Sequence, residues 1–164
     1  MGKHDPTRQG DAHPGIAEAE AEIVEQHRVI AGWLSGRWAR TPEEFAGFAD
    51  SLVDGFTMIG PDGVLTGLAD LLPGFESAYG SVPDLTIDIR DVRPVVTPPR
   101  DRPESSVATG GVTVMTYQEW QGSTGRFSTV VLIADPAARL GYRWRHLHET
   151  WIGRSPVVDI PTGR

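Results

Sequence analysis

Cysteine is absent from the 164 residues of the chain. This absence excludes disulfide bonds, thiol nucleophiles and thiolate metal ligands, and it is typical of a reducing compartment, so we expect a cytoplasmic location. The sequence also has no apolar run near the roughly 20 residues that a membrane-spanning helix needs. The opening residues lack the apolar core of a secretory signal. Any catalysis must therefore use oxygen or nitrogen groups.

Positive charge is in short supply, with 15 Lys and Arg against 22 Asp and Glu and a formal net charge of −7. A chain of this charge is repelled by phosphate backbones and by anionic lipid head groups, so we expect neither nucleic acid nor membrane as a partner. The sequence contains no Gly-rich phosphate loop, no Gly-x-Ser-x-Gly elbow and no acidic calcium loop. Nucleotide, serine-hydrolase and calcium functions are excluded, and we expect no organic cofactor.

The length and the 39% content of hydrophobic residues suit a single domain with one continuous core. Residues 1–15 mix Pro, Gly and charge without periodicity, which predicts an N-terminal tail. We assign residues 16–153 to the folded domain and residues 154–164 to a C-terminal tail.

Helical periodicity dominates the first half of the domain. Apolar residues spaced by three and four predict a long amphipathic helix from Ile16 to near Gly36. A second helix follows Thr41, which can cap it in a capping box with Glu44. A third helical segment is predicted to split at Pro73.

A short hairpin is predicted for residues 54–60 and 64–66, before the third helix. After that helix, the spacing of apolar residues changes to the period of two that is typical of strands. Alternating apolar residues predict long strands over 85–90, 107–121, 127–134 and 142–152. Helices first and long antiparallel strands afterwards indicate an α+β fold, in which a curled antiparallel sheet packs on the N-terminal helices. The curl leaves a cavity between the sheet and the helices.

This order of elements resembles the nuclear transport factor 2-like superfamily. The stretch from Phe56 to Gly63 is similar to the first strand and turn of that family, and the stretch from Trp144 to Thr150 is similar to its last strand. The last strand also resembles the association domain of calcium/calmodulin-dependent protein kinase II. The resemblance implies a cone-shaped fold with a central pocket. Because the superfamily includes isomerases, polyketide cyclases, epoxide hydrolases, dehydratases and oligomerisation domains, it does not imply one reaction.

The last strand carries two histidines, His146 and His148. Alternation with a period of two places both on the same side of the strand as Trp144. They either exchange protons with a ligand, hydrogen-bond within the sheet, or lie in a dimer interface. Together with Glu119 as a third ligand, the two histidines could bind a metal ion. The sequence does not establish whether Glu119 lies on the same side of the sheet as His146, so we predict no metal site.

A second candidate cluster lies at the hairpin turn, where Glu119 and Arg126 can meet as a cross-strand ion pair. The pair is either solvated or part of the pocket, where the resemblance implies that Arg126 or Arg145 acts with Glu119 or Glu149 on a water or an anionic substrate.

The remaining candidates are aromatic or basic side chains at spacings that suit either a pocket lining, core packing or a dimer seam. The predicted substrate-binding residues are Trp144, Tyr117, Trp120, His27 and Trp33.

Two functions are consistent with these patterns. The first is a small enzyme without an organic cofactor that isomerises, cyclises, hydrates or dehydrates a mainly apolar small molecule. In it His146, His148 and Glu119 transfer protons and Arg126 stabilises negative charge. The second is a non-catalytic module for ligand binding or oligomerisation. In both cases we expect a homodimer, since an outer sheet surface carrying Trp120 or Trp151 exposes apolar area.

Overall fold

The first helix of the computed structural model, α1, spans Ile16–Leu34 and is the longest helix of the described residues, 15–96 and 111–153. The Glu18 carboxylate accepts the Gly15 backbone N–H at its start. Gly36, just beyond the end, has a φ of 69°, the left-handed conformation that glycine adopts without strain. The predicted helix is confirmed to within two residues.

The other helices are α2, Pro42–Ala49, and α3, Leu68–Ser77. Thr41 caps α2 as expected, because its hydroxyl accepts the Glu44 backbone N–H at 3.3 Å. The expected split of α3 at Pro73 is wrong, because the helix continues through that proline. Proline removes one backbone donor, but the apolar face of α3 still packs on the core through residues such as Leu72 and Phe75.

The strands form one six-stranded sheet in the order β2-β1-β6-β5-β4-β3. Their bounds are Leu52–Ile59 for β1, Leu65–Gly67 for β2, Asp88–Val96 for β3, Val112–Gln121 for β4, Thr124–Ala134 for β5 and Tyr142–Trp151 for β6. Neighbouring strands are antiparallel except β1 and β6, which run parallel. The predicted curled sheet is therefore confirmed, with one parallel pair. Strand β3 begins later than its alternating pattern predicted, and the first residues predicted for β4, 107–110, lie outside the described residues, as do the predicted tails apart from Gly15.

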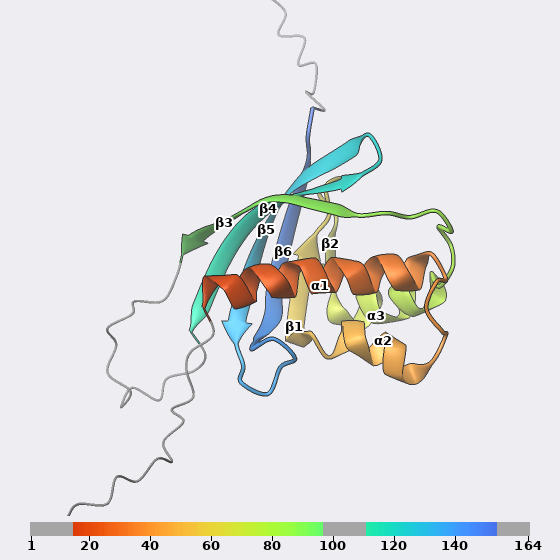
Figure 1. Ribbon diagram of the computed structural model, residues 1–164, viewed down its shortest axis with the longest axis horizontal. Coiled ribbons are helices and arrows are strands. Elements are labelled where there is room, and N and C mark those ends of the chain that lie inside the picture. Colours follow the sequence, from red (N-terminus) through yellow and green to blue (C-terminus); the bar gives the residue numbers. More distant parts are fainter. Residues whose placement is uncertain (1–14, 97–110, 154–164) are drawn as a thin grey trace, which may run out of the picture.

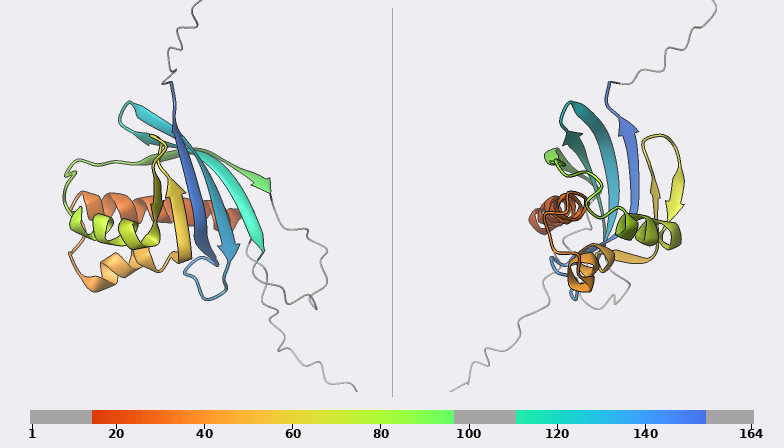
Figure 2. Two further views of the ribbon diagram at one scale, coloured as in Figure 1. Left: turned by 180° about the vertical axis from the view of Figure 1, so that it is seen from behind. Right: turned by 90° about the vertical axis from the view of Figure 1, so that its right-hand side faces the viewer.

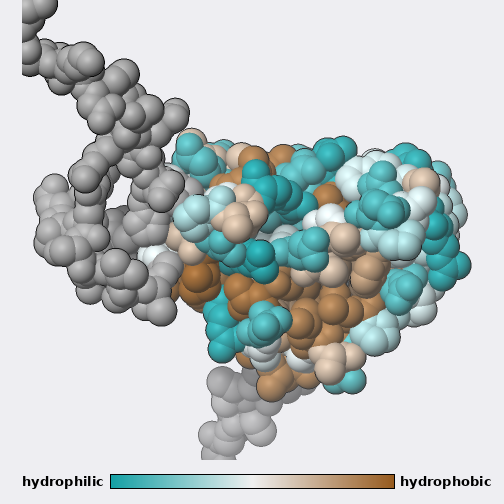
Figure 3. All heavy atoms as spheres, turned by 90° about the horizontal axis from the view of Figure 1, so that it is seen from below, coloured by the Kyte–Doolittle hydropathy of each residue, from teal (hydrophilic) through white to brown (hydrophobic). Residues whose placement is uncertain are grey.

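The helices all cover one side of the sheet, which we call the helix-facing side; the opposite side is the outer side (Figures 1 and 2). Between the two layers lies the core, where Trp33 packs against Phe45, Phe75 and Tyr79. From below, where α2 and the lower end of β1 lie, hydrophobic residues form a continuous area among hydrophilic ones (Figure 3). No helix of the described residues is both long and apolar enough to cross a membrane.

Strand β6 changes its facing in the middle. On the neighbouring strand β5, the consecutive residues Val131 and Leu132 pair with His146 and Trp144 of β6. Arg145 therefore has no partner of its own in this pairing and forms a β-bulge. The adjacent strand β1 is irregular at the same level, where Gly55 has a φ of 75° and its carbonyl accepts the Arg145 guanidinium. Trp144 therefore lies on the helix-facing side, whereas His146 lies on the outer side.

Candidate functional site

Two neighbouring rows of polar side chains cross the helix-facing side of the sheet. In the first row Tyr117, Ser128 and Glu149 are paired across β4, β5 and β6. The second row aligns Glu119, Arg126 and Trp151 in the same way. Buried residues such as Val130 and Leu132 form the rows beyond them, so the polar side chains stand at one end of an apolar core.

Arg126 joins two buried carboxylates. Its Nη1 donates to Glu149 Oε2 at 3.0 Å, and its Nη2 lies 3.6 Å from Glu119 Oε1. The side chains of Glu119 and Glu149 are 5% and 3% exposed, whereas that of Arg126 is 22% exposed. The arginine is therefore the member of this carboxylate–arginine–carboxylate cluster that a ligand can reach most easily.

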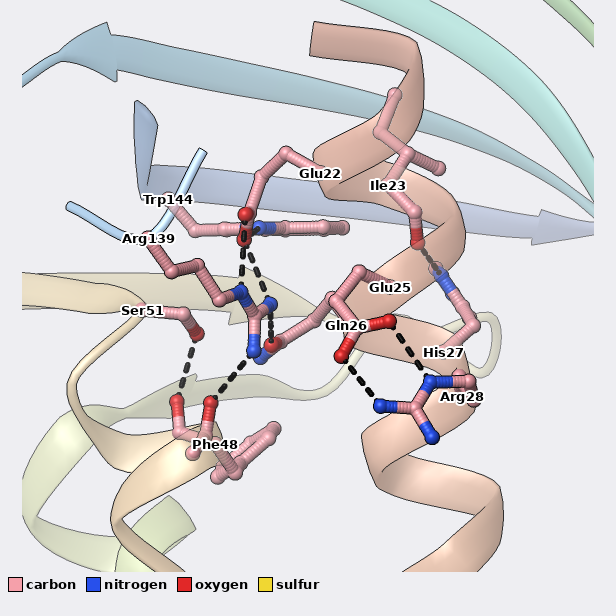
Figure 4. A network of polar contacts seen from close by, with 11 residues as sticks. Glu22, Ile23, Glu25, Gln26, His27, Arg28, Phe48, Ser51, Arg139 and Trp144 are labelled. Atoms are coloured by element: carbon pink, nitrogen blue, oxygen red, sulfur yellow. Dashed lines mark hydrogen bonds and ion pairs between the residues drawn. The ribbon is translucent and has the colours of Figure 1, made fainter. Parts of the chain in front are cut away.

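His27 of α1 closes the cluster from the helix layer. Its Nδ1 lies 2.7 Å from the Ile23 carbonyl, which only accepts, so Nδ1 carries a proton (Figure 4). Its Nε2 lies 3.3 Å from Glu119 Oε2. A bare ring nitrogen facing a carboxylate would be repelled, so this contact is favourable only with one more proton between His27 and Glu119.

The two glutamates respond to this environment in opposite ways. Burial alone would raise the pKa of Glu119, but the hydrogen bond and charge of His27, together with Arg126, outweigh it and lower that pKa to about 2. Burial raises the pKa of Glu149, and the negative charge of Glu119 adds to this effect while Arg126 opposes it. The cluster thus holds one strongly ionised carboxylate beside one that retains its proton more readily.

Two buried hydroxyls lie next to Glu149. The Tyr117 and Ser128 hydroxyls lie near each other, and neither makes a well-formed hydrogen bond with any described residue. Leaving such a group unsatisfied costs about 1–3 kcal/mol, which a bound polar atom would recover. Burial, followed by the charges of Glu119 and Glu149, raises the pKa of Tyr117 well above its usual value, so the phenol remains a donor.

A groove of about 500 Å³ lies between α1 and the start of β3 and meets the site at His27, whereas Glu119, Arg126 and Glu149 are not among its lining residues. Its lining includes His27 and Ile89, and Ile89 is the register partner of Glu119. A larger hollow of about 660 Å³ lies between α3 and the β1–β2 hairpin, but it has no ionisable lining residue. The smaller groove is therefore the opening that suits acid–base chemistry.

The predicted catalytic residues do not form one cluster. Glu119 and Arg126 meet as an ion pair on the helix-facing side. His146 and His148 lie on the outer side, where His146 Nδ1 is 2.9 Å from the Thr57 hydroxyl. The expectation that both histidines share the facing of Trp144 is wrong, because the bulge at Arg145 shifts the alternation by one residue.

The predicted substrate-binding residues also separate. Tyr117 and His27 belong to the site and contact each other edge to face, with ring centroids 5.3 Å apart. Trp33 lies in the core and donates its indole N–H to the Phe75 carbonyl. Trp120 lies on the outer side, where its ring covers Gly125 and its N–H donates to Gln118.

Trp144 is a core residue tied to a buried ion pair that the sequence did not reveal. Its indole N–H donates to Glu22 at 3.1 Å. Arg139, from the loop before β6, donates to both oxygens of Glu22 and also to Gln26 (Figure 4). The Glu22–Arg139 ion pair holds this loop against α1, about one helical turn before His27. In the sequence, Glu22 and Arg139 are 117 residues apart and look like ordinary surface charges.

Among the described residues, no group of three or more His, Asp or Glu side chains is arranged to hold a metal ion. The site is therefore a set of proton donors and acceptors around one guanidinium. Such a set can move a proton and stabilise a negative charge.

Solved structures resemble the chain, although no family profile and no curated protein sequence matches it. An NTF-2-like protein of unknown function from Pseudomonas aeruginosa is 25% identical, with a TM-score of 0.66, and the match covers 83% of this chain and 99% of that one. The S. rosetta CaMKII hub is 16% identical, with a TM-score of 0.54, and the match covers 83% of this chain and 95% of the hub. The chain therefore has the fold of the nuclear transport factor 2-like superfamily, as its sequence resemblance indicated.

Proposed function

We propose that the protein is a small acid–base enzyme that isomerises, cyclises, hydrates or dehydrates a mainly apolar molecule. The observation that carries this proposal is the pair of buried carboxyl groups joined by Arg126, whose pKa values move in opposite directions. Environments that separate two pKa values in this way assign different protonation states to neighbouring groups. The proposed chemistry needs no organic cofactor.

Glu149 is the proton-exchanging group in this proposal. A general acid or base works best when its pKa is near the working pH, and the pKa of Glu149 moves in that direction. Glu119, with its pKa lowered to about 2, is a weak base. Its role is to hold Arg126 and His27 in place as a fixed negative charge.

Arg126 and the Tyr117 hydroxyl complete the proposed mechanism. In an isomerisation, ionised Glu149 removes a proton from the carbon beside a carbonyl, and the electron pair left behind moves to the carbonyl oxygen. Arg126 and the Tyr117 hydroxyl stabilise that negative oxygen as donors. Where a C=C bond adjoins the deprotonated carbon, Glu149 then returns its proton to the far end of that bond, so the double bond shifts into conjugation with the restored carbonyl and the carboxylate is regenerated.

The test is a turnover assay with a panel of small apolar ketones, epoxides and hydroxyketones in deuterated water, read by mass spectrometry. Turnover or solvent deuterium uptake should fall at least about 100-fold in Glu149→Gln, because the variant cannot exchange the proton. His148→Ala, on the same strand but on the outer side, is the matched control and should leave the rate unchanged. Undiminished turnover in Glu149→Gln, or a panel without any reaction, would contradict the proposal.

Self-association through the outer side of the sheet is the second candidate function, with a homodimer as the simplest product. The residues in the middle of this surface on β4, β5 and β6 carry no carboxylate and no guanidinium. They are Thr116, Gln118, Phe127, Thr129, Val131, His146, His148 and Thr150. An uncharged sheet surface with an exposed aromatic ring favours contact with a second copy.

A further inference from the structure

We infer that the groove between α1 and residues 86–89 binds a mainly apolar molecule that carries one acidic group, with Arg37 as the partner of that group. The inference deepens the proposed function by naming the class of its ligand. It rests on that function only for the link between the groove and catalysis.

The walls of the groove suit an apolar ligand. Its volume of about 500 Å³ falls within the range of roughly 300–1,000 Å³ typical of small-molecule sites. Figure 1 shows the chain that leads into β3 crossing above α1, and the groove lies between these two segments. The apolar lining residues are Val24, Ala31, Trp38, Ile87 and Ile89.

The flat wall formed by Trp38 is built closely against α1. A Cβ atom on Gly32 would lie only 2.5 Å from the Trp38 ring, so the indole rests directly on the helix backbone. The Arg28 guanidinium lies over the same ring at 4.7 Å from its centroid. These contacts fix the ring in place, so Trp38 adds a rigid apolar surface to the groove lining.

The charges around the groove leave one cation without a counter-ion. Arg28 is paired with Glu25, and Asp88 is paired with Arg90 at 2.6 Å. Arg37 donates Nη1 to the Leu85 carbonyl and forms no ion pair with any residue of the described ranges. At the inner end, His27 and Glu119 compensate each other. A ligand with one negative group therefore complements the groove.

The experiment compares two fluorescent probes by titration into the full chain. Anilinonaphthalene sulfonate carries one acidic group, and phenylnaphthylamine has the same rings without it. We expect the sulfonate probe to bind at least about tenfold more tightly, and Arg37→Gln to remove that difference. Arg40→Gln, an exposed arginine outside the groove lining, is the control and should change neither affinity.

A second pair of variants locates the binding. Val24→Trp fills the groove from its exposed end and should weaken both probes at least about tenfold, whereas Ala21→Trp, on the same helix but outside the groove lining, should not. Equal binding of the two probes, or no effect of Val24→Trp, would overturn the inference. Probe binding that behaves as expected while the substrate panel shows no turnover would reject the enzyme proposal alone.

Discussion

Glu119 and Glu149 show at the scale of single residues how position decides the chemistry of one side-chain type. Both are buried on the helix-facing side and both contact Arg126. Glu119 also meets His27 and the Gln121 amide, and these interactions outweigh the cost of burying its charge. For Glu149, burial and the charge of Glu119 outweigh Arg126 and the weaker effect of His27, so its pKa rises. Neither difference is visible in the local sequence.

Replacing Glu119 with Gln should change how acid destabilises the protein. Because the folded-state pKa of Glu119 is lowered, its carboxylate stabilises the fold at higher pH, and this stabilisation is lost as the pH falls from about 4.5 to about 2. Unfolding free energies from urea titrations should therefore fall less steeply across this range in Glu119→Gln than in the wild type. Glu20→Gln, an exposed position on α1, should keep the wild-type slope. An unchanged slope in Glu119→Gln would show that the carboxylate is not held as described.

At the scale of elements, the paired irregularity in β1 and β6 decides which side chains form the site. A β-bulge inserts one residue and moves every later residue of the strand to the other side of the sheet. Here it brings Glu149 to the helix-facing side and His148 to the outer side. Gly55 makes the bend in β1 possible, since its φ of 75° is strained for any residue with a Cβ atom.

Gly55→Ala should therefore destabilise the fold by about 1–2 kcal/mol, the cost of a left-handed conformation for an L-residue. A Cβ atom at this position would also lie 3.4 Å from the Arg145 guanidinium. The matched change Gly74→Ala, within α3 and with open space around the added atom, should stabilise by about 0.5–1 kcal/mol. Thermal and urea unfolding of both variants measure the difference. Equal effects of the two substitutions would contradict this account of the bulge.

At the scale of the whole molecule, the outer side of the sheet has no covering layer formed by the described residues. All helices of residues 15–96 and 111–153 lie on the other side (Figure 2). Phe127 is 50% exposed in the middle of this surface, beside the uncharged side chains of β4 and β6. The proposed homodimer would cover this area.

Phe127→Lys should convert the proposed dimer to a monomer at micromolar concentrations, because the substitution places a charge in an interface that offers it no partner. Sedimentation velocity or light scattering measures the mass. Val24→Lys, an equally exposed valine on the helix layer, should leave the mass unchanged. A wild-type protein that is already monomeric under these conditions would contradict the self-association proposal.

The sequence by itself determined the order of elements, the α+β class and the helix-covered curled sheet, because periodicity, caps and turns are local properties of the chain. It also indicated that Glu119 and Arg126 can meet across the turn predicted at residues 122–125, and the structure sets their register by pairing Gln121 with Thr124. Only the tertiary structure decided the facing of β6, because a bulge depends on the neighbouring strand and leaves no mark in an alternating pattern. The position of His27 over Glu119 and the Glu22–Arg139 pair likewise arise from packing between distant segments. The segment from Trp144 to Trp151, whose facing the sequence left open, presents Glu149 to the helix-facing side and His146 and His148 to the outer side.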